Sequence, residues 1–440
     1  MLVRRLLLPV VLLAAAACGT EEYSNPPPVD RFVYPTGLAL HRLPSGTNAL
    51  LVVSSNVDLL YEPDAGGTVI SLDPTADPPR WLGAVTIPSF GGPIVVADEE
   101  SCPGVGVPRA FVASRYAASL LMPEIGTGGE LTCGTGCARA LADGVEDPFG
   151  VAVACRGERR RAYVGYLAGL QNAGVLTELD LESGAQSDIT GLPGIPYGID
   201  YDAERDRLWL GQYGLGLASV TALELGVPCL PEEETCPRKT PTYDLWSVVR
   251  GAEPTGIALS NPQPGLGRRL YVAARVYDPD VASAAGARPG YDVGAVLFVI
   301  DVEDGPTGHP PSPIPVVRVV PLGLGARQIR VLPVRPGMRD LVAVTSTTEG
   351  LVTLYDDEVG AIAKVLAAAQ EPSGPENPAG APLGPPRVGT QPFGLAVEAR
   401  DGMDWIYVAS FTSGTVTAIS LDPSSPSDAV IVWSIAGVAP

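Results

Sequence analysis

The sequence contains only two histidines among its 440 residues, and this scarcity restricts the hydrolytic chemistry that it can support. His41 follows an apolar run, where a surface turn is expected, and His309 lies in a proline-rich insertion, Gly-His-Pro-Pro. A serine-type triad needs a histidine at a central site, and we expect neither residue there. The sequence therefore does not favour a histidine-dependent hydrolase.

Metal and phosphate signatures are missing as well. No glycine-rich loop follows a strand and opens a helix, as phosphate-binding loops do, and no Asp-x-Asp-x-Asp-Gly calcium loop is present. Cys133 and Cys137 lie close together, but no histidine or second close cysteine pair accompanies them as zinc ligands. The acidic groups at 278–280 and 356–358 are typical of solvated turns. We therefore expect no metal ion and no cofactor.

Positive charge is also scarce. Charged residues make up 18% of the chain, the net charge is −20 and the isoelectric point is about 4.5. An acidic surface repels phosphate backbones, so we expect no nucleic-acid partner. The 51 glycines and 45 prolines favour many short strands joined by turns over a helical fold.

The first 17 residues are expected to be a signal peptide that lies outside the fold. Arg4 and Arg5 precede an apolar run at 6–13, and the alanines at 15–17 are typical of a cleavage site. The run is too short for an ordinary transmembrane helix. Cys18 follows directly, so the segment resembles a bacterial lipoprotein signal, with simple secretion as the alternative.

This resemblance implies that Cys18 is lipidated, although alanine stands at 15 where leucine is usual. Gly19 follows the cysteine, which in Gram-negative cells favours sorting to the outer membrane, with the protein facing the periplasm or the cell surface. The implied partner is then a membrane, held through the lipid anchor. Residues 18–33, with prolines at 26–28, are expected to form the lipidated start and a flexible tether.

The remaining cysteines are even in number, as is typical of an oxidising compartment. With Cys18 set aside, the candidates for disulfide bonds are Cys102, Cys155, Cys133, Cys137, Cys229 and Cys236. The pairs at 133/137 and 229/236 each flank a short loop and suggest local bonds. The first two cysteines remain, each after an apolar strand, but spacing alone does not settle the connectivity.

One phrase, a Pro-x-Gly turn followed by a short apolar strand, recurs along the chain. Clear copies begin at Pro35, Pro148, Pro196, Pro254 and Pro392. Two of the gaps between copies are about twice as long as the others, and each contains a weaker copy, at 92–97 and 326–331. A repeat of about 50 residues with several strands per unit is typical of a β-propeller. Seven copies predict seven blades.

The predicted fold class is therefore all-β: a seven-bladed β-propeller of four-stranded antiparallel blades, forming a single domain over residues 34–440. The expected blades are, approximately, 34–90, 91–145, 146–194, 195–252, 253–324, 325–389 and 390–440. The chain begins on an inner strand and ends on an outer one. We therefore expect the ring to close without a shared blade, unless residues 31–34 add a strand.

The repeat also resembles a known family. The strings at 269–273, Arg-Leu-Tyr-Val-Ala, and at 405–409, Trp-Ile-Tyr-Val-Ala, lie between Pro-x-Gly and Gly-x-Val segments and resemble YVTN-type β-propeller repeats. Lactonase-like propellers are similar. The resemblance covers nearly the whole mature chain and implies the propeller fold. It implies little about function, because propellers host enzymes, ligand binders and scaffolds alike.

In a propeller, the loop after the second strand opens on the same face as the start of the inner strand. Aromatic residues and arginines gather at these positions, and such residues are enriched at recognition surfaces. The candidate ligand-binding residues are Arg115, Tyr116, Tyr166, Tyr213, Arg275, Tyr277, Arg327 and Phe411, with Phe149, Tyr197 and Phe393 at the middle position of Pro-x-Gly. The alternative is that these side chains pack between blades as a structural ring.

These observations favour a cell-envelope lipoprotein whose propeller acts as a binding or scaffold module, with no catalytic residue assigned. The partner would be an unknown protein, glycan or small-molecule ligand. The alternative is a lactonase-like hydrolase that works from the mouth of the central channel through arginine, carboxylate and hydroxyl groups. A third interpretation is a structural component of the envelope. The sequence leaves enzymatic activity open and favours its absence.

Overall fold

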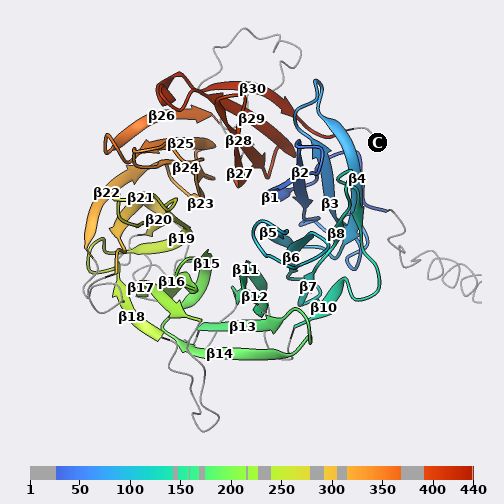
Figure 1. The fold of residues 1–440 in the computed structure, drawn as a ribbon, viewed down its shortest axis with the longest axis horizontal. Coiled ribbons are helices and arrows are strands. Elements are labelled where there is room, and N and C mark those ends of the chain that lie inside the picture. The colour runs from blue at the N-terminus through green and yellow to red at the C-terminus, as the bar shows by residue number, and fades with distance from the viewer. Residues whose placement is uncertain are drawn as a thin grey trace, which may run out of the picture.

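Seven β-sheets stand in a ring around a central axis (Figure 1). This computed structural model describes residues 26–141, 147–157, 159–167, 174–214, 217–225, 239–277, 292–304, 315–367, 391–438 and 440. The all-β, seven-bladed prediction is confirmed. Over the described ranges the only helical element is the short 3₁₀ helix η2 (Pro426–Asp428). None of the helices in this part of the chain is long and apolar enough to cross a membrane.

Each sheet is one blade, and the strands are numbered in chain order. Blade 1 contains β1 (Pro35–Arg42), β2 (Asn48–Ser54), β3 (Gly67–Asp73) and β4 (Arg80–Ile87). Blade 2 contains β5 (Gly91–Ala97), β6 (Arg109–Ser114), β7 (Ser119–Leu121), β8 (Glu124–Ile125), β9 (Leu131–Thr132) and β10 (Ala138–Ala140). Blade 3 contains β11 (Pro148–Arg156), β12 (Arg159–Tyr166), β13 (Gly174–Asp180) and β14 (Gln186–Leu192).

The other four blades have four strands each. Blade 4 contains β15 (Ile195–Asp202), β16 (Arg207–Gly214), β17 (Leu217–Glu224) and β18 (Lys239–Asp244). Blade 5 contains β19 (Ala252–Leu259), β20 (Arg269–Tyr277), β21 (Asp292–Asp301) and β22 (Val316–Leu322). Blade 6 contains β23 (Ala326–Val331), β24 (Leu341–Ser346), β25 (Leu351–Asp356) and β26 (Ala361–Ala367). Blade 7 contains β27 (Pro392–Arg400), β28 (Met403–Ser410), β29 (Thr415–Leu421) and β30 (Val430–Ile435).

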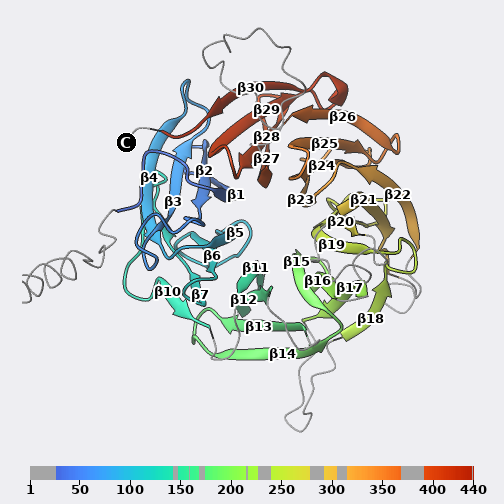
Figure 2. The same cartoon turned by 180° about the vertical axis from the view of Figure 1, so that it is seen from behind.

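The first strand of every blade lies nearest the axis, as both views of the ring show (Figures 1 and 2). All seven of these inner strands have a register shift against the second strand near their start, at the Pro-x-Gly phrase or its weaker copy. A bulge of this kind re-aims the extra side chain. The middle residue of the phrase is thereby placed near the axis, at the end of the ring where the inner strands begin.

Glycine in the phrase is required by close approach between blades. A Cβ at Gly256 would lie 2.2 Å from the carbonyl oxygen of Arg327, and one at Gly37 would lie 2.9 Å from that of Gly92. Neither glycine has a positive φ, so close approach and not backbone conformation requires glycine at these positions. The inner strands crowd around a narrow axis, and a side chain at these positions would separate them.

The hydrophobic core lies between neighbouring blades. Strands β2 and β3 illustrate this, because nearly all of their residues are buried. One apolar cluster joins Leu50 of blade 1 to Tyr407 and Val416 of blade 7 and so closes the ring. Burying a side chain of this size stabilises the fold by about 1.5–3 kcal/mol.

The ring closes without a shared blade, as predicted. Residues 31–34 form no strand. Instead, the Phe32 amide donates to the Ala436 carbonyl at 2.9 Å, and the Val438 amide donates to the Asp30 carbonyl at 2.9 Å. Phe32 and Val438 are buried in the cluster between blades 1 and 7. A short clasp between the two ends of the propeller therefore seals the ring.

Blade 2 departs from the regular pattern because its outer strands are split. Its third strand is divided into β7 and β8 at Pro123, which has no amide hydrogen to donate to the ladder. The carbonyl of Pro123 still accepts a hydrogen bond from the Ala110 amide at 3.0 Å. Its fourth strand is divided into β9 and β10 by the loop that the Cys133–Cys137 disulfide closes.

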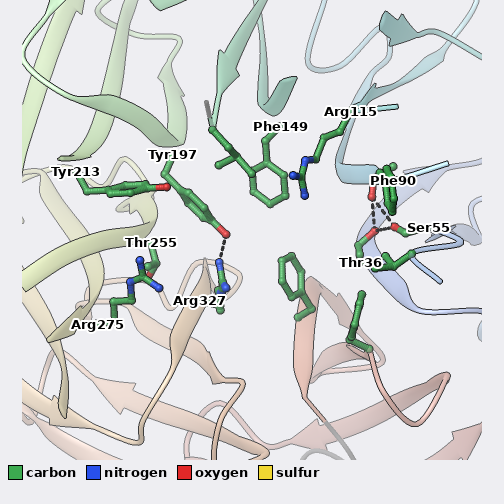
Figure 3. A pocket seen from close by; sticks show the side chains of 15 residues that line it. Thr36, Ser55, Phe90, Arg115, Phe149, Tyr197, Tyr213, Thr255, Arg275 and Arg327 are labelled. Atoms are coloured by element: carbon green, nitrogen blue, oxygen red, sulfur yellow. Dashed lines mark hydrogen bonds between the residues drawn. The ribbon is translucent and has the colours of Figure 1, made fainter. Parts of the chain in front are cut away.

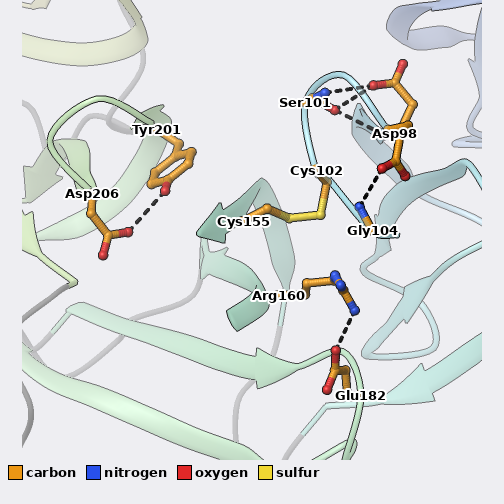
Figure 4. The surroundings of a disulfide bond; sticks show 10 residues. Asp98, Ser101, Cys102, Gly104, Cys155, Arg160, Glu182, Tyr201 and Asp206 are labelled. Carbon is orange, nitrogen blue, oxygen red and sulfur yellow. Dashed lines mark hydrogen bonds and ion pairs between the residues drawn. A yellow bond between two sulfur atoms is a disulfide. The ribbon is translucent and has the colours of Figure 1, made fainter. Parts of the chain in front are cut away.

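The second disulfide, Cys102–Cys155, joins blade 2 to blade 3 (Figure 4). Cys102 lies in the loop that follows β5, and Cys155 lies near the end of β11. All four of these cysteines were disulfide candidates, which is confirmed together with the local bond at 133/137, and the structure shows that Cys102 pairs with Cys155. Cys18, Cys229 and Cys236 lie outside the described residues.

His41 is not on a surface turn, so that expectation was wrong. Strand β1 continues through it, pairing His41 with Ala49, and the side chain is 5% exposed. Its Nδ1 lies 3.1 Å from Oδ2 of Asp98 in blade 2. This hydrogen bond holds the pKa of Asp98 below its usual range. His41 is therefore part of the contact between blades 1 and 2, and His309 lies outside the described residues.

The acidic group at 356–358 is not fully solvated either, which corrects a second expectation. Arg335 donates to both carboxylate oxygens of Asp356, at 3.1 and 2.9 Å. The carboxylate of Asp357 accepts from the hydroxyls of Tyr271 in blade 5 and Tyr355 in blade 6. Buried charges persist where such partners are available. The group at 278–280 lies outside the described residues.

Candidate functional site

A pocket of about 330 Å³ opens where the inner strands begin (Figure 3). We call it the mouth. It is lined by Thr36, Ser55, Val57, Phe90, Gly91, Arg115, Phe149, Leu167, Tyr197, Tyr213, Thr255, Arg275, Arg327, Phe393 and Phe411. These residues come from all seven inner strands, from the ends of the second strands and from the loops beside them. The mouth is therefore formed by equivalent positions of the repeated blades.

Five of the eight candidate residues line the mouth together: Arg115, Tyr213, Arg275, Arg327 and Phe411. Each follows or ends a second strand, except Arg327, which occupies the bulge of β23. The strand order and the bulge explain why residues so far apart in sequence meet here.

Three candidates lie outside the mouth. Tyr116 is 45% exposed, with its ring 6.3 Å from that of Phe90. Tyr277 packs on Trp246, with ring centroids 5.7 Å apart. Tyr166 is only 3% exposed and belongs to the core between blades 2 and 3. Its burial raises the pKa of the phenol to about 12.

The three aromatic residues at the middle position of Pro-x-Gly form most of the bottom of the mouth. The ring of Phe149 lies 4.9 Å from that of Tyr197 and 6.3 Å from that of Phe393. These separations suit favourable aromatic contacts. We call Phe149, Tyr197, Phe393 and Arg327 the aromatic floor. All four also line a second cavity beneath the mouth, so they form the boundary between the two.

Arg327 differs from the other two arginines of the mouth. Its guanidinium lies 5.6 Å from the ring centroid of Tyr197 and 5.3 Å from that of Phe393, and it donates a hydrogen bond to the Tyr197 hydroxyl. In the part of the chain that the structure describes, no carboxylate forms an ion pair with it. A cation over two ring faces is held in place while its charge remains uncompensated by contact.

The other two arginines are paired. Arg115 forms an ion pair with Asp147 at 3.0 Å, and Arg275 forms one with Glu253 at 2.7 Å. Burial raises the pKa of Glu253, and Arg275 opposes this. These two arginines therefore contribute less free positive charge to the mouth than Arg327 does.

Asp292 is the acidic residue whose electrostatic influence reaches the floor. Burial raises its pKa, and the charges of Arg275 and Arg327 oppose the increase. It makes no ion pair with either arginine. Among the described residues, Arg327 therefore interacts electrostatically with Asp292 but has no carboxylate in contact with it.

The hydroxyl groups in the mouth have structural partners. The hydroxyls of Thr36 and Ser55 both donate to the carbonyl of Gly91, at 2.8 and 2.5 Å (Figure 3). The Thr255 hydroxyl donates to the carbonyl of Ala326 at 2.6 Å. Each bond joins one blade to the next. The middle position of Pro-x-Gly is therefore structural where it is threonine and faces the mouth where it is aromatic.

Among the described residues, the lining of the mouth includes no aspartate, glutamate or histidine that could act as a general base. Among the residues that the structure describes, no group of three or more His, Cys, Asp or Glu side chains could hold a metal ion. The arrangement is suited to binding through ring faces and a guanidinium.

The second cavity, which we call the channel, has a volume of about 560 Å³ and runs along the inner strands beneath the floor. Its lining combines aliphatic side chains with polar ones, among them Asp200 of β15 and Arg330 of β23. Neither residue was predicted from the sequence. A signal existed, because the corresponding position in four other copies of the repeat is alanine: Ala39, Ala152, Ala258 and Ala396.

Comparison with known proteins extends this description only to the fold. No family model and no curated protein matches the chain. Hydrazine synthase from Kuenenia stuttgartiensis is similar in structure, with a TM-score of 0.56 and 12% identity over 92% of this chain and 98% of that one. The β-propeller domain of Cps50 (Swd1) from Myceliophteria thermophila has a TM-score of 0.52 and 10% identity over 88% and 96%.

A lactonase-like protein is also among the structural neighbours. A Bacteroides uniformis protein described as a candidate 6-phosphogluconolactonase has a TM-score of 0.48 and 14% identity over 74% of this chain and 82% of that one. The structural similarities reported above show a propeller architecture. Sequence identities this low carry no argument about activity.

Proposed function

We propose that the protein is an envelope-anchored binding protein whose mouth takes a small planar anion. The carrying observation is Arg327, a guanidinium held over two rings at the floor with no carboxylate contact among the described residues. A guanidinium presents a planar fork that matches a carboxylate. The ring faces beside it suit the flat apolar part of the same ligand. A planar carboxylate satisfies both features at once.

The lactonase-like alternative has less support at the mouth. Hydrolysis of a lactone needs a general base or an activated nucleophile. The described lining offers no carboxylate or histidine, and its threonine and serine hydroxyls donate to carbonyls of the next blade. Turnover of simple lactones above the uncatalysed rate by the purified protein, lost in Arg327→Gln, would favour the hydrolase instead.

Benzoate and benzamide test the proposed ligand class, because they have nearly the same shape and differ in charge. We expect the purified protein to bind benzoate about tenfold or more tightly than benzamide, since a charge-assisted hydrogen bond is lost with the neutral amide. Isothermal titration calorimetry measures both affinities. Arg327→Gln should remove the preference for benzoate.

Arg80→Gln is the matched control, because Arg80 is 69% exposed on the outer strand β4. This variant should keep the full preference for benzoate. Circular dichroism establishes that both variants are folded. Equal affinity for benzoate and benzamide in the unmodified protein, or an unchanged preference in Arg327→Gln, would show that the mouth does not select anions through this residue.

We further propose that the chain is lipidated on Cys18 and held at a bacterial outer membrane. The signal-like segment at 1–17 and the cysteine that follows it support this. The two disulfide bonds also suit an oxidising compartment outside the cytoplasm. Stable anchoring requires two or more acyl chains.

Metabolic labelling with radioactive palmitate tests this anchor. Label should enter the unmodified protein expressed in a Gram-negative host, and Cys18→Ser should abolish it because the thiol is the acceptor. Cys18→Ser should also move the protein from the membrane fraction to the soluble fraction. Equal labelling of both proteins, or none of either, would contradict lipidation at Cys18.

A further inference from the structure

The channel beneath the aromatic floor is chemically unlike the mouth. A large part of its wall comes from aliphatic side chains of the inner strands, such as Val151, Val153, Ile199, Ile257 and Val331. Exposed residues of the loops that follow β5 and β15, Glu100 and Ala203, line the end away from the floor. The inner strands run from the mouth toward these loops, so the channel is reached from the opposite face of the ring.

Asp200 places a carboxylate in this apolar wall. Its Oδ1 accepts from the Tyr201 amide at 2.9 Å, and its Oδ2 accepts from the Leu259 amide at 2.7 Å. These two bonds fix the carboxylate against blade 5. Each carboxylate oxygen can accept a further hydrogen bond. Burial raises the pKa of Asp200, and the positive charges of Arg330 and Arg268 oppose this.

Arg330 places a guanidinium in the same wall, from blade 6. Its one hydrogen bond within the described residues runs from Nη1 to the carbonyl of Ile329, at 3.1 Å. Most of its N–H donors thus remain unused. Burial lowers its pKa, and Asp200 is the charge that opposes this. The two charges act on each other, but no ion pair within 4.0 Å forms between them.

Two opposite charges in an apolar cavity, neither in contact with the other, are costly unless something compensates them. A simple anion would serve Arg330 and be repelled by Asp200, and a simple cation would do the reverse. A ligand with both an ammonium and a carboxylate compensates both charges and brings no net charge into the channel. Its apolar part would lie against the aliphatic walls.

We propose that the channel binds a small aliphatic zwitterion of the α-amino acid class, with its carboxylate on Arg330 and its ammonium on Asp200. This site is distinct from the mouth, whose described lining contains arginines and no carboxylate. The proposal does not depend on the function proposed for the mouth. The two sites require different ligand charges and can therefore be tested separately.

Leucine and two of its derivatives test the proposal on the unmodified protein. L-leucinamide lacks the carboxylate, and N-acetyl-L-leucine lacks the ammonium. Isothermal titration calorimetry should show that L-leucine binds about 10- to 100-fold more tightly than either derivative, since each loses a charge-assisted contact. Failure of leucine to bind at millimolar concentration, or equal binding of the three compounds, would overturn the proposal.

Two variants assign the charges to residues. Arg330→Gln should remove the preference for leucine over leucinamide, and Asp200→Asn should remove the preference for leucine over N-acetyl-leucine. Arg330→Lys keeps the charge without the planar fork and should retain part of the first preference. Near-ultraviolet circular dichroism establishes that each variant is folded, and the three-ligand comparison on the unmodified protein stands if one is not.

Arg115→Gln separates the channel from the mouth, because Arg115 lines the mouth and not the channel, whereas Arg327 lines both. Arg115→Gln should bind leucine as the unmodified protein does. If Arg115→Gln abolishes leucine binding while Arg330→Gln leaves it intact, then leucine binds in the mouth and the channel proposal is wrong.

Discussion

Gly256→Ala is expected to lower the free energy of unfolding by about 2–3 kcal/mol. The added methyl group would lie 2.2 Å from the carbonyl oxygen of Arg327, which is backbone of the next blade and cannot rotate away. Blades 5 and 6 must separate at the axis to accept it. The same movement displaces the residue that carries the proposed anion site, so benzoate binding should weaken too. Urea unfolding followed by circular dichroism measures the loss of stability.

Gly134→Ala is the matched control for this substitution. Gly134 is exposed, has no positive φ, and a Cβ there would meet nothing within 4 Å. Its stability should change by less than about 0.5 kcal/mol. If Gly256→Ala is as stable as Gly134→Ala, the inner strands do not pack as closely as described.

Removing the Cys102–Cys155 disulfide should have an effect of similar size. The double variant Cys102→Ala with Cys155→Ala is expected to lose about 2–4 kcal/mol of stability, because a crosslink with a sequence separation of 53 strongly restricts the unfolded chain. It also releases the loop after β5, whose Glu100 and Ser101 line the open end of the channel. Thermal unfolding under non-reducing conditions measures the loss.

The Cys133–Cys137 disulfide provides the comparison. Its sequence separation is only 4, so the corresponding double alanine variant should lose about half as much stability. That bond lies within blade 2 and joins no neighbouring blade. Equal losses of stability for both double variants would mean that the Cys102–Cys155 disulfide, which connects blades 2 and 3, stabilises the protein no more than the Cys133–Cys137 disulfide within blade 2.

The repeat made the architecture predictable because it reflects a packing requirement that most blades share. The five clear copies have glycine where neighbouring inner strands approach each other at the axis, and the two weaker copies have Pro93 and Gln328 there. Blade 2 was less predictable beyond its second strand. Pro123 interrupts its third strand, and a single proline within a short apolar run does not reveal how the chain resumes.

Buried polar contacts between blades were not predictable from local sequence. His41 and Asp98 lie in different blades, as do Tyr271 and Asp357. His41 and Asp357 alone resemble ordinary surface residues of an acidic protein. Only the closed ring brings them to their partners, so the local sequence favoured a surface turn for His41 and a solvated turn for the group at 356–358.

The mouth was partly predictable because strand order places the loop after each second strand beside the bulge of an inner strand. This explains the position of Arg115, Tyr213 and Arg275. Tyr166 ends a second strand as they do, but its side chain is turned into the core between blades 2 and 3. Alternation along a strand decides this direction, and a one-residue difference in where the strand ends reverses it.

A crystal structure of the protein with benzoate tests the central claim most directly, because it shows where the anion lies. We predict benzoate in the mouth, with its carboxylate within about 3 Å of the Arg327 guanidinium and its ring against Phe393 or Tyr197. Benzoate bound only outside the mouth, or a mouth in which Arg327 contacts Tyr197 and Phe393 alone at saturating benzoate, would contradict the account.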